Sequence, residues 1–496
     1  MKIKLNLKIE SNQIIQFLSL FFVSIIFRYY LPKFGGDVFF AGLVVLFLRS
    51  NNNYFWLPLF LLLFDPPGGL FNPSSLTFSL PGIAFGGGGR EIPFSEMFVV
   101  ATFLKVYQIR KLKKFFFSTP FVVLAAYLIF LLFVSFILGT TFLRALKMVR
   151  HILPFLMFFS IPRLLPTCDD YYKLFELLFI ASIVLFGAQI YDLVTGSKIA
   201  FLFGETAVQS GFGNLRYANE TMDINSGINR VFYGPTISLL CMLGAMYFIS
   251  LKDKTANNKY YYFILLLNFL MVILSGTRGW ILSYSTMVIL FYLFVLRNPF
   301  SLIKQGLLSA IVFILLLVYF PSISKQIEYS FERFQTVKAL ARGDLTADHT
   351  LIRLDVRGPR VLNKFWERPV FGFAFSQEFY QYADQHVGHH TLLLNGGIVG
   401  YALFLFFWIY FNLFLYFKNK HLQNNNLYKD SLFVFIIIFI GIFIIHSSSA
   451  MIFGFFINVP MGIMLALVFC FTDTVYKESQ YLEHAIKAIQ FQPLII

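Results

Sequence analysis

Charged residues are scarce in this sequence. Asp, Glu, Lys and Arg make up 13% of the 496 residues, whereas hydrophobic residues make up 58%. A soluble domain usually carries about 25% charged residues, so a soluble protein of this composition would lack the polar groups to cover its surface. The chain has three cysteines, Cys168, Cys241 and Cys470, which lie far apart in the sequence. Their spacing excludes a disulfide framework and a cysteine-based metal site.

Two further patterns are missing. The sequence lacks the two-residue alternation of a transmembrane β-barrel, and it lacks a glycine-rich loop of the kind that holds nucleotide phosphates. The formal net charge is +15, but the basic residues fall in short segments between apolar runs, as the positive-inside rule predicts for a membrane protein. We therefore expect no nucleic-acid partner and no cofactor.

Long apolar runs dominate the chain instead. Runs of about 18 or more apolar residues indicate transmembrane helices, and only helices and closed barrels satisfy the backbone in lipid. We predict an all-α polytopic membrane protein that forms a single integral membrane domain over residues 1–496. Because the second and third runs are short, we expect about 12 to 14 transmembrane helices. The predicted spans are 13–31, 37–50, 53–65, 94–109, 116–138, 143–165, 171–193, 231–250, 260–275, 279–296, 302–320, 390–417, 431–447 and 449–472.

The basic residues also predict an orientation. Segments rich in Lys and Arg, such as 110–114 and 418–429, alternate along the chain with segments poor in them, such as 66–92 and 194–230. If both termini are cytoplasmic, the basic segments all lie on the cytoplasmic side. Residues 321–389 then form one large loop on the outer side, between late spans. Ordered loops of this length are usually functional.

Arginines gather on the side of this loop. Arg230, Arg278 and Arg353 are distant in sequence, yet the predicted topology puts all three on the outer side, together with Arg357. A guanidinium group pairs with two oxygens at once, so such a cluster suits a phosphate or pyrophosphate group. Interfacial anchoring of each arginine is the alternative. The Gly-Thr-Arg-Gly sequence around Arg278 frees the backbone for close approach, which favours a functional role there.

Histidines cluster near the end of the same loop, at His386, His389 and His390. One hypothesis is a zinc site that includes Asp384, but no cysteine and no second cluster supports it, and we expect no metal. The second hypothesis is a general base, because an imidazole pKa of about 6.5 suits proton abstraction from a hydroxyl group. A solvated loop end without a chemical role is the third interpretation.

The sequence of this region resembles the superfamily of O-antigen ligases and O-antigen polymerases. The resemblance rests on Arg353, on the Pro-Val-Phe-Gly sequence at 369–372, and on His386, which lies eleven residues before the Gly-Ile-Val-Gly sequence at 397–400. In the family, an arginine, a similar turn and a His-Asn pair precede a glycine pair that opens a span. The many-span plan with one large outer loop is also similar to that of the family.

The resemblance has departures and additional matches. The family's Asn is replaced here by Val387, and a second register would use His389, eleven residues before Gly400, without the second glycine. Upstream, residues 229–235 are similar to an arginine segment that precedes a span in the family. Residues 275–279 are similar to its Ser-x-Ser-Arg hairpin.

The resemblance implies an inverting glycosyltransferase at the periplasmic face of the bacterial inner membrane. The donor would be a glycan on undecaprenyl pyrophosphate, and the acceptor a hydroxyl of a saccharide or of the lipid A core. Arginines would bind the pyrophosphate as it leaves, and a histidine would deprotonate the acceptor hydroxyl. The residues implied are Arg230, Arg278 and Arg353 for substrate binding, and His386 or His389 for catalysis. Arg357, four residues after Arg353 in the same loop, is a further candidate for substrate binding.

Two other functions stay open at this point. A transporter or flippase for polysaccharides or lipid-linked oligosaccharides would show paired repeats or interrupted spans in two halves, and this sequence lacks such symmetry. A membrane glycosyltransferase with a carboxylate base would use Asp37 or Asp65, which lie near the predicted outer ends of spans. In that enzyme His386 would be dispensable.

Overall fold

The protein is mainly helical in the part of the chain that the structure describes. This computed structural model describes residues 9–29, 33–64, 77–79, 91–108, 114–141, 153–195, 232–251, 258–300, 353–384, 386–424, 426–448 and 459–490, with isolated positions between 303 and 342. The helices are α1 (Ser11–Tyr29), α2 (Lys33–Arg49), α3 (Asn53–Phe64), α4 (Phe94–Tyr107), α5 (Ser118–Ile137), η2 (Leu153–Phe155), α7 (Leu156–Leu164), α8 (Cys168–Thr195), α11 (Pro235–Ser250), α12 (Asn258–Leu274), α13 (Arg278–Leu290), η5 (Phe291–Val295), η6 (Arg353–Arg357), α17 (Gly358–Phe365), α18 (Gln377–Tyr382), α19 (Gly388–His421), α20 (Ser431–Ser448) and α21 (Val459–Gln490). One short antiparallel pair joins β1 (Thr77–Ser79) to β2 (Glu91–Pro93).

Six helices are long and apolar enough to cross a membrane. They are α5, α8, α13 together with η5, α19, α20 and α21, and shorter apolar helices include α1, α3, α7, α11 and α12. The described residues thus agree with the predicted helical membrane protein, while the number of spans stays a prediction. Most of the predicted outer loop, from 321 to 352, lies outside the described residues. The part that follows forms the short helices η6, α17 and α18.

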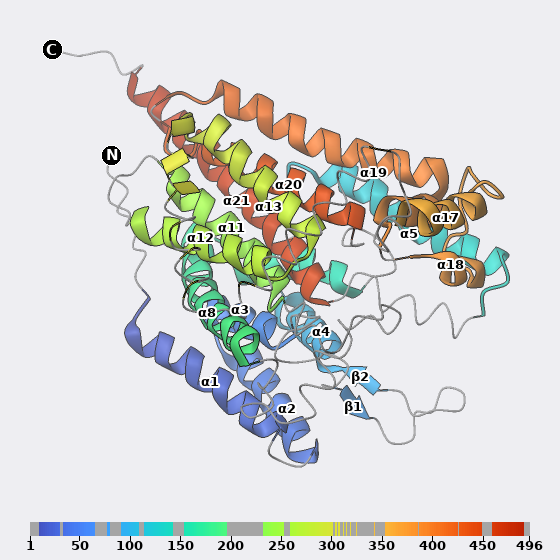
Figure 1. The fold of residues 1–496 in the computed structure, drawn as a ribbon, viewed down its shortest axis with the longest axis horizontal. Helices are drawn as coiled ribbons and strands as arrows, with labels where there is room; N and C mark the ends of the chain where they lie inside the picture. The colour runs from blue at the N-terminus through green and yellow to red at the C-terminus, as the bar shows by residue number, and fades with distance from the viewer. Residues whose placement is uncertain are drawn as a thin grey trace.

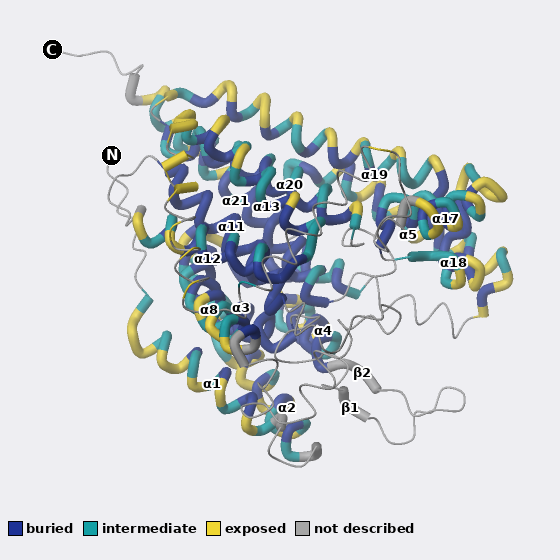
Figure 2. Tube along the Cα trace, viewed as in Figure 1, coloured by how far each residue is buried: buried dark blue, intermediate teal, exposed yellow. Residues whose placement is uncertain are grey.

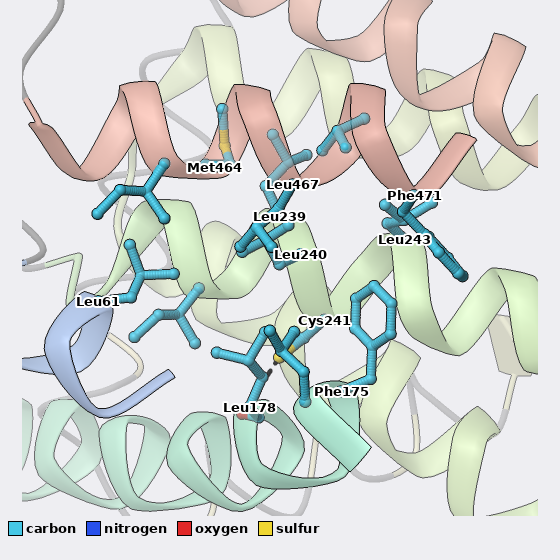
Figure 3. Packing of buried hydrophobic residues seen from close by; sticks show 14 of the residues in the cluster. Leu61, Phe175, Leu178, Leu239, Leu240, Cys241, Leu243, Met464, Leu467 and Phe471 are labelled. Carbon is cyan, nitrogen blue, oxygen red and sulfur yellow. Dashed lines mark hydrogen bonds between the residues drawn. The ribbon is translucent and has the colours of Figure 1, made fainter. Parts of the chain in front are cut away.

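Helix α21 forms the centre of the bundle. In its apolar window 83% of the residues are buried, compared with 22% for α5 and 28% for α19. Figure 1 shows the helices arranged around α21, and Figure 2 shows exposed positions along α1 and α19. In the core, Leu467 of α21 lies beside Leu239 of α11, and Leu178 of α8 lies beside Cys241 of α11 (Figure 3). The peripheral helices expose apolar side chains, which is the arrangement expected for a surface in contact with lipid.

Polar contacts join several segments to α21 at one end of the bundle. At one end, the Phe116 N–H donates to Asp473 Oδ1 at 3.0 Å, and the Tyr428 hydroxyl donates to Glu478 Oε2 at 2.8 Å. The segments before α5 and between α19 and α20 therefore meet the second half of α21. The starts of α13 and α19 lie at the opposite end, where both contact the end of α20, and α17 and α18 lie beside the start of α19 (Figure 1). Within the described residues, the basic end of α19 and the described part of the predicted outer loop, 353–384, thus lie at different ends.

Helix α19 is broken at Gly397. This glycine has φ 65° and ψ −168°, a region that is essentially restricted to glycine. The turn at 369–374 fills the break: the N–H groups of Phe373 and Ala374 donate to the carbonyls of Leu394 and Asn395, both at 2.8 Å. In the reverse direction, the Ile398 N–H donates to the Pro369 carbonyl at 2.8 Å. Backbone groups that the break would leave unpaired are therefore paired with the turn.

Two glycines permit this backbone approach. A Cβ atom on Gly397 would lie 2.2 Å from the Val370 carbonyl oxygen, and one on Gly372 would lie 2.6 Å from the Gly397 nitrogen. Gly372 also has a positive φ, 66°. The Ser135 hydroxyl of α5 accepts the Phe375 N–H at 2.9 Å. The segment before α19 is thus attached by its backbone to both α19 and α5.

Replacing Gly397 by alanine should destabilise the protein, because a left-handed non-glycine residue is strained and the new methyl group overlaps the Val370 carbonyl. We expect the free energy of unfolding to fall by about 2 to 4 kcal/mol. The midpoint of thermal unfolding in detergent, followed by circular dichroism, measures this loss. Gly187→Ala in α8 is the matched control, since no atom lies within 4 Å of its new Cβ. Equal midpoints for the two variants would contradict the role of the break.

Candidate active site

The last turn of α20 contacts the first turns of both α13 and α19. A Cβ atom on Gly279 would lie 1.9 Å from Ser448 Oγ, and one on Gly388 would lie 2.0 Å from the His446 carbonyl oxygen. Both glycines are therefore places where one helix touches another directly.

Both helices run antiparallel to α20. Ser283 of α13 donates to the Gly441 carbonyl at 2.8 Å, and Trp408 of α19 packs against Phe439. Arg278 is the first residue of α13, and His389 is the second residue of α19. The structure thus brings these two predicted residues to the same turn of α20 from different helices.

The start of α11 lies at the same end. The ring of Phe232 packs edge-on against Trp280, with centroids 5.2 Å apart, and the Tyr284 hydroxyl donates to Ser238 Oγ at 3.1 Å. Gly234, with φ 59°, turns the chain into α11. Arg230, which was predicted from the segment just before this turn, lies outside the described residues.

Arg357 lies beside a carboxylate. Its Nε is 3.8 Å from Asp384 Oδ2, and Nη2 of Arg360 is 3.7 Å from the same oxygen. Arg357 and Arg360 are three residues apart on consecutive helical turns, so their side chains project from one face. The backbone of Arg353 belongs to η6, while its side chain lies outside the described part. Arg360 was not among the predicted residues, and its sequence carries no motif that would have indicated it.

His386 follows this carboxylate directly. Its N–H donates to Asp384 Oδ1 at 2.9 Å, and the residue is 9% exposed. The predicted arginine and the predicted histidine are therefore joined through Asp384, which the sequence suggested only as a possible metal ligand. Within the described residues, no group of three or more His, Cys, Asp and Glu side chains is placed to hold a metal ion.

His389 lies in the interface between α19 and α20. Its Nδ1 is 3.3 Å from the Tyr401 hydroxyl, and its ring centroid is 4.5 Å from that of Phe443. The ring of His446 meets it edge-on, with centroids 4.8 Å apart, and His446 is fully buried. These contacts give His389 a place in helix packing.

An ion-pair network holds α17 against α18. Lys364 Nζ lies 2.6 Å from Glu367 Oε2 and 2.5 Å from Glu378 Oε2. Hydrogen bonds to Glu367 and Glu378 raise the pKa of Lys364, so its charge is retained at neutral pH. The ammonium group also lies over the ring of Phe373, 4.8 Å from the centroid.

The described contacts do not bring either acidic candidate for the base, Asp37 or Asp65, to the residues around Asp384. Asp37 belongs to α2, which packs against α1 and α4. Asp65 lies outside the described residues.

The site thus combines two arginines, a bridging carboxylate and a histidine, at the end of the bundle where α13 and α19 begin. Helix N-termini carry partial positive charge, which favours bound anions beside the arginines. Comparison with known proteins adds no relative: no protein-family model and no curated protein matches this sequence.

Proposed function

We propose that this protein transfers a glycan from undecaprenyl pyrophosphate to an acceptor sugar hydroxyl, in the manner of an O-antigen ligase or polymerase. One observation carries the proposal. Arg278 and His386, which the resemblance selected from distant parts of the sequence, begin or precede helices that both contact the last turn of α20. Arg357, a candidate from the same loop as His386, is joined to it through Asp384. Residues chosen at random for their chemistry would not be expected to converge in this way.

The proposed reaction is a single inverting displacement. The acceptor oxygen attacks the anomeric carbon and forms the new glycosidic bond, while the bond from that carbon to the pyrophosphate oxygen breaks. His386 takes the proton of the acceptor hydroxyl. The lipid pyrophosphate leaves with the bonding electron pair, and Arg278, Arg353 and Arg357 stabilise the negative charge that develops on it. Arg230 would belong to the same set of cations.

The acceptor distinguishes two versions of this reaction. In a ligase it is a saccharide of the lipid A core, and in a polymerase it is the end of a second lipid-linked repeat. Both versions need the same arginines and the same base, so the proposed site supports them equally. In both, the reaction takes place at the periplasmic face of the inner membrane, with the two chain termini in the cytoplasm.

Loss of the arginines should abolish product. In a strain that lacks this gene, we expect plasmids encoding Arg278→Ala or Arg353→Ala to yield less than about 1% of the wild-type surface polysaccharide, because each removes cationic stabilisation of the leaving group. Polysaccharide is read on a gel after membrane abundance has been matched. Arg297→Ala is the control, since Arg297 lies at the other end of the α13–η5 helix, 67% exposed and paired with Asp430.

The outcome has two informative alternatives. Full product in both arginine variants would refute the site and favour the transporter or flippase. If the arginine variants lose product, the strain without the gene separates the two versions. Unattached long chains would indicate a ligase, and single capped repeats would indicate a polymerase.

The two histidines should differ in effect. Removal of a general base typically costs about 100-fold to 10,000-fold in rate, and we expect His386→Ala to fall in this range in a purified assay with a lipid-linked donor. His389→Asn should lose less than about tenfold, because Asn keeps a hydrogen-bonding group for Tyr401 at the helix interface. A larger loss in His389→Asn than in His386→Ala would assign the base to His389. Full activity of His386→Ala together with loss in Asp37→Asn would instead support a carboxylate base.

A further inference from the structure

A single carboxylate, that of Asp384, contacts both arginines and the backbone of the proposed base. Its Oδ2 lies 3.7 Å from Arg360 Nη2 and 3.8 Å from Arg357 Nε. Its Oδ1 accepts the His386 N–H at 2.9 Å. The two oxygens therefore face different parts of the site, one toward the cations and the other toward the histidine.

The backbone of Asp384 is itself fixed to α19. Its N–H lies 3.2 Å from Thr391 Oγ1, and the Thr391 hydroxyl donates to the Asp384 carbonyl at 2.7 Å. The Val387 N–H donates to the same carbonyl at 3.2 Å. Thr391 is buried in the first turn of α19. The position of the carboxylate is thus determined by α19, and the long arginine side chains adjust to it.

Exposure separates the carboxylate from the cations. The side chain of Asp384 is 11% exposed, whereas those of Arg357 and Arg360 are 33% and 48% exposed. A ligand that arrives from outside would therefore meet the arginines before the carboxylate. Two guanidinium groups against one carboxylate leave an excess of positive charge. Both distances also exceed the roughly 2.7 to 2.9 Å of a direct charge-assisted hydrogen bond, so the pairing is loose enough for the arginines to engage an anion.

We propose that Asp384 is a positioning residue that joins the anion-binding arginines to the base. It orients Arg357 and Arg360 to receive a pyrophosphate group, which makes Arg360 a further binding residue, and it holds the backbone of His386 at the same time. The identity of the anion rests on the proposed function. A change at Asp384 thus alters both anion binding and the placement of the base, whereas a change at Arg360 alters anion binding alone.

Two substitutions separate the two parts of this role, which are to orient the arginines and to hold the backbone of His386. Asp384→Asn keeps an oxygen that accepts the His386 N–H but removes the charge that orients the arginines. We expect the KM for a lipid-pyrophosphate glycan donor to rise about tenfold, with kcat within about threefold of wild type. Asp384→Ala also removes the acceptor, and kcat should then fall at least about tenfold further. The rates are measured on the purified full-length protein in detergent, per folded molecule.

Glu378→Gln is the matched control. It removes one carboxylate charge from the same segment, at the Lys364–Glu378 pair, and we expect wild-type KM and kcat. Wild-type constants for Asp384→Asn would overturn the proposal. Equal losses in Asp384→Asn and Glu378→Gln would also overturn it, since they would reflect a general disturbance of the segment.

A binding measurement separates this inference from the proposed function. Inorganic pyrophosphate is titrated calorimetrically into the wild-type protein and into Asp384→Asn and Arg360→Ala. If the wild-type protein transfers no glycan, but both variants bind pyrophosphate about tenfold more weakly, the proposed function fails and the arrangement around Asp384 stands. If the wild-type protein transfers glycan and Asp384→Asn binds pyrophosphate as tightly as the wild type, the inference alone fails.

Discussion

The need to pair backbone groups in an apolar interior determines how this site is built. The break at Gly397 interrupts α19 inside the bundle, where unpaired N–H and carbonyl groups would be costly. The turn at 369–374 pairs with them and so becomes a fixed part of the bundle. The segment that carries Arg357, Asp384 and His386 runs through this turn. The broken helix and the polar segment are therefore one structural unit, and neither would be stable in this arrangement without the other.

The residues of the candidate site and of the glycine sequences fall into two groups: those that form this unit and those that carry the proposed chemistry. The glycines at 372 and 397 form the joint itself, because each lies where a side chain would collide with the backbone of the other segment. Gly400 continues the joint by packing against Tyr127 of α5. Arg278, Arg357 and His386 instead lie outside the joint and carry the proposed chemistry. The glycines thus account for how the segment is held, and the proposed reaction rests on the polar residues alone.

Hydropathy predicted individual helices well where the chain is uniformly apolar. The predicted spans 116–138 and 431–447 nearly coincide with α5 and α20. The predicted span 449–472 does not coincide with α21, whose described part runs from Val459 to Gln490. Charged residues beyond 472 look like the end of a span, but Asp473–Lys477 and Glu483–Lys487 are i,i+4 pairs that suit a continuing helix. In the site, the pairing of Arg360 with Asp384 could not be predicted, because a contact between separate elements leaves no periodic signal.

The position of the site within the bundle fits a donor that is half lipid and half water-soluble. On one side lies the end of α20, in whose apolar window 61% of the residues are buried. On the other side lie the start of α19 and the end of α5, a helix with few buried residues that exposes apolar side chains such as Phe133 and Ile137. In the proposed reaction, the polyprenyl chain of the donor would contact the exposed apolar side chains of α5, while its pyrophosphate would bind the arginines. The proposed lipid-linked donor would need apolar and polar surfaces side by side, whereas a soluble sugar donor would not.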